Sequence, residues 1–451
     1  MKSELFLGAL RFTPFWLFLD GVLLVHFFAS WIYSFYKTGW KVDFFHLTLL
    51  QALIIPVFLI YPFNGSEINM LTLGPDNFLS ADPYIDYAFC ITLIGYMGIR
   101  FGAILLHICE IKLFCDRLFS IFRPLATCIT KNIESKNSLL FLFYLTVFLT
   151  FIITYISSLQ DYFLRPRAYF QINELTRPIY NATISIAPIL ISFLSIRYLQ
   201  YKERWVKSLL IISFFMSLFY GIRSVFITGL ISLFAYKAYK NKGSFNFKKG
   251  VLFSCIIVII ALEIEKIREG DFINLFYFSF NYLTSIFSVL AYGNHLSDTR
   301  DFAWVLSCWD QEYLYGLGYL ANLLSFIPSS LLEFRQIYSL SPYTSNLIGL
   351  DTSIHSGVRP GYFGQLFFNF GPIGVFLGGL CMGLALKSAD LELRTSIDSK
   401  NNIIEGYAKT IPYLCITTLL IAPLYWQFYL FILMNLLCTL LRKFSYSKLY
   451  Q

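Results

Sequence analysis

Long apolar runs alternate with short polar segments along almost the whole chain. The first three runs extend from Pro14 to Tyr33, from Phe45 to Tyr61 and from Tyr87 to Ile108. Each approaches the length of about 20 apolar residues that crosses the hydrocarbon core of a bilayer. Backbone amides have no water to bind in lipid, so each run is predicted to be a transmembrane α-helix.

The same pattern continues to the carboxyl end. Further spans are predicted at Leu139 to Ile156, Pro178 to Ile196, Ser208 to Phe219, Val225 to Tyr236, Val251 to Glu263, Leu366 to Ala385, Tyr407 to Leu424 and Trp426 to Leu440. The total is about eleven spans, with the amino terminus outside and the carboxyl terminus inside. The short runs on either side of Arg223 are interpreted as two spans, because a single helix would bury this arginine in mid-membrane.

Composition places the chain in the same class. Hydrophobic residues make up 57% of the chain and charged residues 14%, whereas soluble domains carry about 25% charged residues. The net charge of +8 does not indicate nucleic-acid binding, since the basic residues fall in short loops where the positive-inside rule expects them. The nine cysteines form no C-x-x-C pair, which argues against a disulfide framework and a zinc site. The first run lacks a small-residue cleavage site, so it is interpreted as a span and not as a signal peptide.

The chain is expected to have three parts. Residues 1–265 form an amino-terminal bundle of about eight spans, residues 266–365 a large outer loop, and residues 366–451 the last transmembrane helices. Aromatic-rich runs in the loop, Phe272 to Tyr292 and Tyr313 to Ile327, are predicted to lie along the membrane surface as amphipathic helices; one of them being re-entrant is the alternative. Ser388 to Glu405 is predicted to be a polar inner loop.

The stretch from Thr352 to Gly383 carries the most informative residues. His355-Ser356-Gly357-Val358-Arg359-Pro360-Gly361 is rich in turn formers, and Asn369-Phe370-Gly371-Pro372 leads into an apolar helix. Its small residues, Gly378, Gly379 and Gly383, allow close packing against a neighbouring helix. The planar guanidinium of Arg359 is suited to binding two phosphate oxygens. This stretch therefore predicts a polar site at the rim of a membrane bundle.

Six arginines are predicted to lie on the outer face, which breaks the positive-inside expectation. They are Arg165, Arg167, Arg177, Arg223, Arg268 and Arg359. Cationic side chains that converge there would neutralise a departing pyrophosphate. The alternative is that each arginine reaches lipid phosphates or pairs with a nearby acid.

Few residues are suited to acid–base work. His355 is a candidate general base because imidazole titrates near neutral pH. Glu265 and Glu174 are alternative bases, although Lys266 and Arg268 beside Glu265 also make it an ion-pair candidate. Asp298 and Asp301 suit a metal-diphosphate site, but a helix cap is the favoured interpretation. Nucleotide, metal and soluble-hydrolase motifs are absent, so no cofactor and no metal are expected.

Taken together, these features resemble the bacterial Wzy oligosaccharide repeat-unit polymerases, which include the polymerases of O-antigen, capsule and enterobacterial common antigen. The resemblance rests on length, span number and the order of four short motifs. These motifs are Gly221-Ile222-Arg223, Lys266-Ile267-Arg268-Glu269-Gly270, Phe326-Ile327-Pro328-Ser329, and His355-Ser356-Gly357 followed by Asn369-Phe370-Gly371. Arg223, Arg268 and His355 match motif positions, whereas Arg359, Arg165 and Arg167 are added from charge and placement.

The resemblance implies a GT-C-like membrane glycosyltransferase in the bacterial inner membrane. Such an enzyme transfers a growing glycan from undecaprenyl pyrophosphate to an incoming lipid-linked repeat unit at the periplasmic face. Its expected partners are these lipid-linked oligosaccharides, membrane lipids, a chain-length regulator and a flippase, but no nucleic acid. Catalytic roles are assigned to His355, Arg223 and Glu265, and pyrophosphate binding to Arg359, Arg268, Arg165, Arg167 and Lys266. The alternatives are an O-antigen ligase and, in a different class, a lipid-linked oligosaccharide flippase or transporter.

Overall fold

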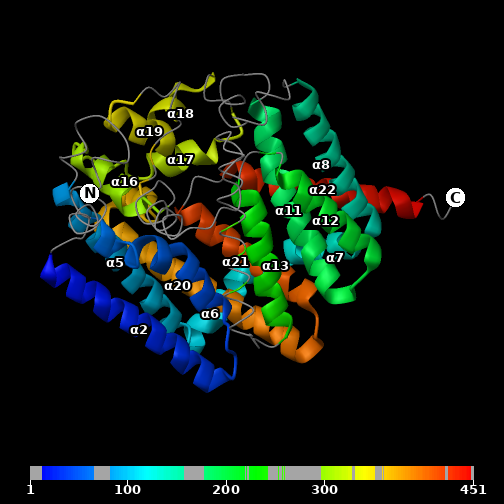
Figure 1. The fold of residues 1–451 in the computed structure, drawn as a ribbon, viewed down its shortest axis with the longest axis horizontal. Helices are drawn as coiled ribbons and strands as arrows, with labels where there is room; N and C mark the ends of the chain where they lie inside the picture. The colour runs from blue at the N-terminus through cyan, green and yellow to red at the C-terminus, as the bar shows by residue number, and fades with distance from the viewer. Residues whose placement is uncertain are drawn as a thin grey trace. The chain divides into compact units, whose positions relative to one another are not determined.

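The chain is helical throughout the part that can be described. The computed structural model describes residues 13–64, 82–156, 177–218, 220, 223–241, 252, 256, 259, 296–327, 331–350, 358, 360–421 and 425–447. These residues form helices joined by turns, and no strand occurs among them (Figure 1). The predicted all-α class is confirmed for these ranges.

The helices fall into two stretches of the chain. The first contains α2 (Pro14–Thr38), α3 (Phe44–Leu49), the π-helix η1 (Leu50–Phe58), the 3-10 helix η2 (Tyr61–Phe63), α5 (Asp82–Leu105), α6 (Cys109–Ser120), α7 (Arg123–Glu134), α8 (Lys136–Ile156), α11 (Arg177–Tyr201), α12 (Arg204–Leu218) and α13 (Arg223–Lys240). The second contains α16 (Asp298–Ser307), α17 (Leu317–Leu323), α18 (Glu333–Tyr338), α19 (Leu340–Leu347), α20 (Gly364–Lys400), α21 (Ile403–Ile421) and α22 (Tyr425–Ser447).

Seven helical stretches within the described residues are long and apolar enough to cross a membrane. They are Pro14–Thr38, Phe44–Phe63, Pro83–Leu105, Lys136–Tyr155, Pro178–Tyr201, Gly364–Lys400 and Tyr425–Lys443. The polytopic α-helical class is therefore supported, whereas the total of about eleven spans stays a prediction. The predicted span from Val251 to Glu263 lies almost wholly outside the described residues.

Two predictions about where helices end can be compared with the structure; the first agrees with it and the second does not. The short apolar runs around Arg223 form two separate helices, α12 and α13, which pack on each other and on α11. The predicted inner loop from Ser388 to Glu405 is wrong for most of its length, because α20 continues to Lys400. Ala389, Leu393 and Ile397 are buried at four-residue spacing, which gives this polar stretch an apolar helical face.

Internal packing divides the chain into two compact units. Unit 1 comprises Met1–Leu118, Ser279–Asp390 and Tyr413–Trp426, and unit 2 comprises Phe119–Phe278, Leu391–Pro412 and Gln427–Gln451. The three parts expected from the sequence divide the chain at other positions. The two units are described separately below.

Side-chain contacts distinguish two ends in unit 1. At one end the hydroxyl of Tyr61 donates to Asp86 at 2.6 Å. At the other end, where α2 stops and α3 begins, the amide of Phe44 donates to Asp390 at 2.9 Å. These are called the Tyr61 end and the Asp43 end. The short helices α16 to α19 pack at the Tyr61 end, where the ring of Phe302 lies 5.8 Å from that of Phe367.

Glycines let α5 and α20 approach backbone to backbone. A Cβ added at Gly98 or Gly102 on α5 would collide with a carbonyl oxygen of α20, that of Phe376 or Leu380. One added at Gly379 or Gly383 on α20 would collide with carbonyl oxygens of α5. The expected role of the small residues in the apolar helix is therefore confirmed for Gly379 and Gly383.

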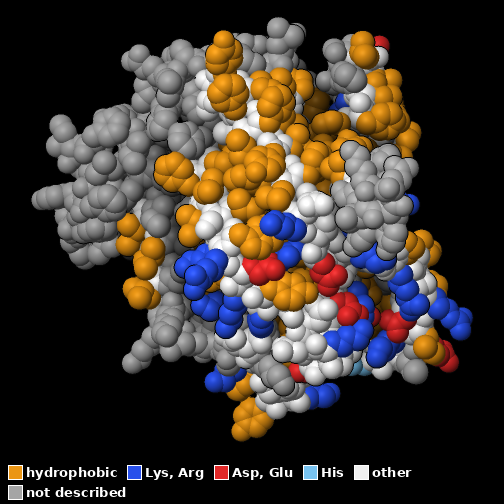
Figure 2. All heavy atoms as spheres, turned by 90° about the vertical axis from the view of Figure 1, so that its right-hand side faces the viewer, with side chains coloured by type: hydrophobic (Ala, Val, Ile, Leu, Met, Phe, Trp, Pro, Cys, Tyr) orange, Lys and Arg blue, Asp and Glu red, His pale blue; other side chains and the backbone are white. Residues whose placement is uncertain are grey.

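Unit 2 is built around α11, which packs against α7, α8, α12 and α13. Its polar anchor is Arg197, which binds the Glu203 carboxylate at 2.8 Å and donates to the carbonyls of Ile133 and Glu134 at 3.0 and 2.5 Å. Figure 2 shows one face of the molecule, on which hydrophobic and charged side chains gather in separate areas. This separation is the pattern that a protein crossing a bilayer presents.

Candidate functional site

The predicted catalytic and pyrophosphate-binding residues mostly lie outside the described residues. These are Arg165, Arg167, Glu265, Lys266, Arg268, His355 and Arg359. Arg223 is the first residue of α13, but only its backbone is described. The roles assigned to all eight stay predictions.

The chain on both sides of position 359 is firmly held at the Tyr61 end. The hydroxyl of Thr344, on α19, donates to the carbonyl of Val358 at 3.0 Å. Gly361 has a positive φ of 67°, and a Cβ there would meet the Phe302 ring on α16 at 3.1 Å. Only glycine combines this backbone conformation with such a close approach. The predicted polar loop is thus anchored to α16 and α19.

A break in α20 follows directly. Gly371 adopts φ 67° and ψ −166° inside the helix, a conformation essentially limited to glycine. Pro372 has no N–H, so the carbonyl of Phe368 loses its usual donor four residues on. The amide of Leu314 replaces that donor at 2.8 Å. The side chain of Asn369 reinforces the contact, since its oxygen accepts from the amide of Gly318 at 3.1 Å.

An aromatic surface with acidic neighbours lies at this break. The ring of Trp309 is 5.2 Å from the rings of Phe367 and Tyr313. Asp310 and Glu312 beside it are exposed. Aromatic faces next to carboxylates offer apolar contacts and hydrogen-bond acceptors, the two features that a sugar ligand uses.

Asp298 and Asp301 form the first turn of α16. The hydroxyl of Ser297 donates to the Asp301 carboxylate at 2.8 Å, and no side-chain hydrogen bond caps the helix at Ser297. The two acids lie where the helix dipole favours negative charge, and the helix-cap interpretation stays a prediction. Among the described residues, no group of three or more His, Cys, Asp or Glu side chains could hold a metal ion.

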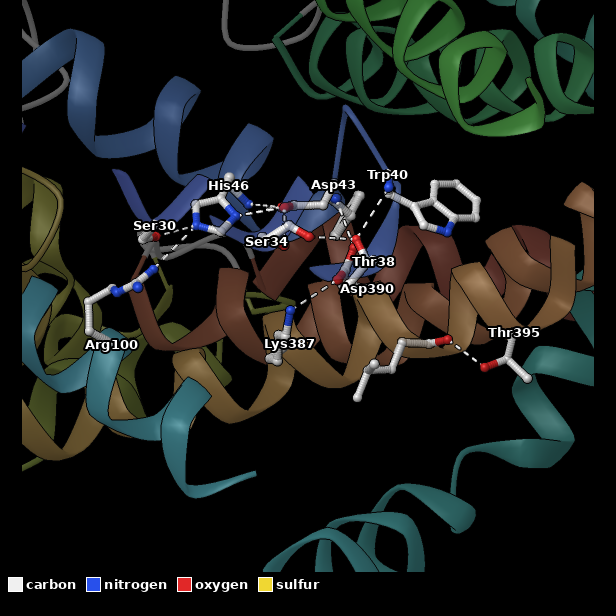
Figure 3. Close-up of polar contacts among 12 residues, drawn as sticks. Ser30, Ser34, Thr38, Trp40, Asp43, His46, Arg100, Lys387, Asp390 and Thr395 are labelled. Atoms are coloured by element: carbon white, nitrogen blue, oxygen red, sulfur yellow. Dashed lines mark hydrogen bonds and ion pairs between the residues drawn. The ribbon is translucent and has the colours of Figure 1, made fainter. Parts of the chain in front are cut away.

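A second polar cluster occupies the Asp43 end of unit 1 (Figure 3). Nδ1 of His46 lies 2.7 Å from the Asp43 carboxylate, and Nε2 lies 2.6 Å from the Ser30 hydroxyl and 3.4 Å from the Arg100 guanidinium. Asp43 also accepts from the backbone amide of His46 at 2.6 Å and from the hydroxyl of Ser34 at 3.1 Å. The first of these contacts caps the amino terminus of α3.

The cluster extends to α20. The carboxylate of Asp390 accepts from the amide of Phe44 at 2.9 Å and lies 3.3 Å from the ammonium group of Lys387. Asp43 and Asp390 are both 0% exposed, and His46 is 3% exposed. The buried network therefore joins α2, α3, α5 and α20.

The donors and acceptors indicate how the ring of His46 takes part in this network. A carboxylate can only accept, so Nδ1 of His46 carries the hydrogen and Nε2 accepts from Ser30 and Arg100. The network contains two carboxylates, Asp43 and Asp390, and two basic side chains, Arg100 and Lys387, of which Lys387 pairs with Asp390. A buried network is tolerated when its charges are paired and hydrogen-bonded in this way.

Burial acts to raise the pKa of Asp43. Hydrogen bonds with His46 and electrostatic attraction to it, together with the charge of Lys387, outweigh burial, so the pKa of this carboxyl lies below its ordinary value. Asp43 is therefore ionised at neutral pH.

Ser30, His46 and Asp43 stand in the order of a serine nucleophile, its base and its orienting acid. Ser30, however, lies inside α2, where backbone amides donate within the helix. No backbone oxyanion hole can form beside it, and Arg100 is the donor next to the His46 ring. We therefore interpret the cluster as an ionisable tie between helices.

Sequence reasoning missed this cluster. One signal was available, because Arg100 lies inside an apolar run, and an ionisable residue there is a functional candidate by default. The partners were not readable, since Phe44 and Asp390 are 346 residues apart. Comparisons with protein-family models, with curated proteins and with solved structures find no match for this chain.

Proposed function

We propose that the protein is a Wzy-type polymerase of lipid-linked oligosaccharide repeat units. The hydroxyl oxygen of an incoming unit attacks the anomeric carbon of the growing glycan, and undecaprenyl pyrophosphate leaves. His355 or Glu265 takes the hydroxyl proton, while Arg223, Arg268 and Arg359 bind the leaving pyrophosphate, with Arg165, Arg167 and Lys266 adding positive charge. Because the carrier is already activated, the reaction requires neither a nucleotide nor ATP.

The observation that carries this proposal is the group of short helices, α16 to α19, at the Tyr61 end. There half-buried Trp309 and Tyr313 pack against the fully buried Phe367, next to exposed Asp310 and Glu312. Val358 and Pro360 are buried, and they flank Arg359, for which pyrophosphate binding is predicted. A glycan could bind this surface while its lipid carrier stays in the bilayer.

The distribution of charge supports a periplasmic position for helices α16 to α19. Acids of unit 1 at the Tyr61 end are Asp86, Asp298, Asp301, Asp310, Glu312 and Glu333. Among the described residues of unit 1, six cations lie at or just beyond the Asp43 end, whereas Arg300 on α16 and Arg335 on α18 lie at the Tyr61 end; the six are Lys37, Lys41, Arg100, Lys112, Arg117 and Lys387. Under the positive-inside rule the Asp43 end is cytoplasmic, so the Tyr61 end faces the periplasm of a bacterial inner membrane.

Deletion of the gene and separation of the surface glycan by size would test the proposal. We expect the ladder of long glycans to disappear while single repeat units remain on the surface. Wild type should restore the ladder and Arg223→Ala should not, whereas Arg204→Ala, at an exposed arginine on α12, should restore it. Single units that also vanish, while lipid-linked units accumulate, would contradict polymerisation.

A lipid-linked oligosaccharide transporter is the second candidate. The observation in its favour is the buried ionisable network, together with Asp20, which is 2% exposed inside α2. Buried charges in spans commonly mark substrate or proton pathways. Accumulation of lipid-linked units on the cytoplasmic side in the deletion strain would favour transport, and accumulation on the periplasmic side would favour the ligase.

A further inference from the structure

An apolar groove of about 490 Å³ lies between α2 and α5 in unit 1. Its walls include Val22 on α2, Met97, Phe101 and Ile104 on α5, and Phe376 on α20. Val22, Met97, Phe101 and Ile104 are 47%, 57%, 46% and 60% exposed, so the groove opens sideways from its helices. In a bilayer that opening faces acyl chains.

The groove reaches a cation near the end of its span. Arg100 lines it, and is five residues before the last residue of α5, Leu105, or about 7.5 Å at the helical rise. That depth allows its guanidinium to meet a lipid headgroup.

Arg100 retains binding capacity. Its hydrogen-bond partner among the described residues is Nε2 of His46, at 3.4 Å, and it lies over the Phe45 ring at 5.7 Å. Its Nε is buried without a hydrogen-bond partner there. The nearby Asp43 carboxylate is occupied by His46 and Ser34. A planar guanidinium with unfilled donors is suited to phosphate oxygens.

Helix α2 is incompletely packed where the groove runs. In its most apolar window 17% of the residues are buried, against 28% to 61% in the other six candidate spans. An acyl chain between α2 and α5 would cover apolar surface on both helices. Packing thus gives a second reason, independent of charge, to expect a lipid here.

We propose that the groove binds one anionic phospholipid, with its phosphate at Arg100 and one acyl chain along Met97, Phe101 and Ile104. Neighbouring cations at the Asp43 end, including Lys37 and Lys41, disfavour a headgroup that carries its own ammonium. The lipid holds α2 against α5. The site is at the opposite end of unit 1 from the proposed glycan site and does not depend on polymerase activity.

Native mass spectrometry and thermal unfolding of the delipidated protein in detergent would test this. The probes are phosphatidylglycerol, phosphatidylcholine with the same acyl chains, and glycerol 3-phosphate as the headgroup alone. We expect one phosphatidylglycerol to bind and to raise the unfolding temperature. Arg100→Gln should weaken that binding by about tenfold, the effect of losing about 1.4 kcal/mol of binding free energy.

Lys112→Gln, at an exposed cation on α6, is the matched control and should bind phosphatidylglycerol like wild type. Met97→Trp fills the groove without touching the charge, and it tests the proposal even if Arg100→Gln does not fold. Equal binding of both phospholipids, unchanged binding in Met97→Trp, or an equal loss in Lys112→Gln would overturn the proposal. Glycerol 3-phosphate binding as tightly as phosphatidylglycerol would show a phosphate site without a lipid groove.

Discussion

At the scale of residues, Asp43 binds several groups of the buried network. Its carboxylate caps α3, orients His46 and accepts from Ser34. Such a group stabilises a fold only while it is charged and its cations remain nearby. Asp43 is 0% exposed, so water cannot replace a lost partner.

Asp43→Asn should destabilise the protein strongly. Asparagine retains a capping oxygen but removes the negative charge that accepts from His46 and Ser34, and a buried polar group left without its partner costs about 1–3 kcal/mol, or more where a charge is involved. The measurement is thermal or denaturant unfolding in detergent, with Asp398→Asn, at an exposed aspartate of α20, as the control. Equal stability of the two variants would show that the charge of Asp43 does not stabilise the fold.

The stability of wild type and of Asp43→Asn, measured at several pH values, gives a second test. The pKa of Asp43 is lower in the folded state than its ordinary value of 3.8. Its contribution is therefore complete above that value and is lost as the pH falls through the lower, folded pKa. We expect the stability gap between wild type and Asp43→Asn to persist at neutral pH and to close below about pH 4. A gap that stays constant into acid would show that charge is not its cause.

At the scale of elements, the closest helix contact is between α5 and α20. Gly98 and Gly102 face carbonyl oxygens of α20, and Gly379 and Gly383 face those of α5. Gly371 lies on α20, so the contact between α20 and α5 also fixes the position of this break relative to α5. Without side chains at these glycines, dispersion between backbones provides the packing.

Gly383→Ala should therefore destabilise the protein, by about 1–3 kcal/mol as for other overpacked contacts. Gly21→Ala, on α2, is the matched control, because a Cβ at Gly21 meets nothing within 4 Å. It should be neutral or slightly stabilising, since alanine favours helix over glycine. Unfolding temperatures of the two variants provide the comparison, and a loss of the same size in both would refute close packing as the reason.

The sequence was informative about helices and much less so about partners. Apolar run length predicted the spans near α2, α5, α8 and α11, because bilayer thickness sets that length. Glycine spacing predicted close packing but did not name Ile99 or Gly95 as the contacts of Gly383 and Gly379. The Asp43 network was missed because its members are polar residues scattered over several helices. Their meeting depends on tertiary packing, which one sequence does not contain.

At the scale of the whole molecule, the two units combine segments that are far apart in the chain. Three helices, α20, α21 and α22, contribute residues to both units. Within unit 1 the unequal number of cations at the two ends supports the proposed orientation, which can be tested directly.

We predict that a cysteine replacing Leu331, which is 76% exposed near α18, is labelled by an impermeant maleimide in intact cells with a permeable outer membrane. A cysteine replacing Lys112 on α6 should be labelled only after the inner membrane is opened. Both variants need a background in which the nine native cysteines are replaced. The reverse pattern would invert the orientation and remove the Tyr61 end from the periplasm.

The buried network also has a consequence for biosynthesis. The ribosome makes Asp43 and His46 long before Lys387 and Asp390, since Phe44 and Asp390 are 346 residues apart. The first hairpin consists of α2 followed by α3 and η1, and it carries the Asp43 carboxylate. Until α20 is inserted, Lys387 is absent, and an uncompensated charge in hydrocarbon is unfavourable. The nascent hairpin must keep Asp43 at the headgroups or remain with the insertion machinery. A variant without Lys387 should then be degraded rapidly by quality-control proteases soon after synthesis.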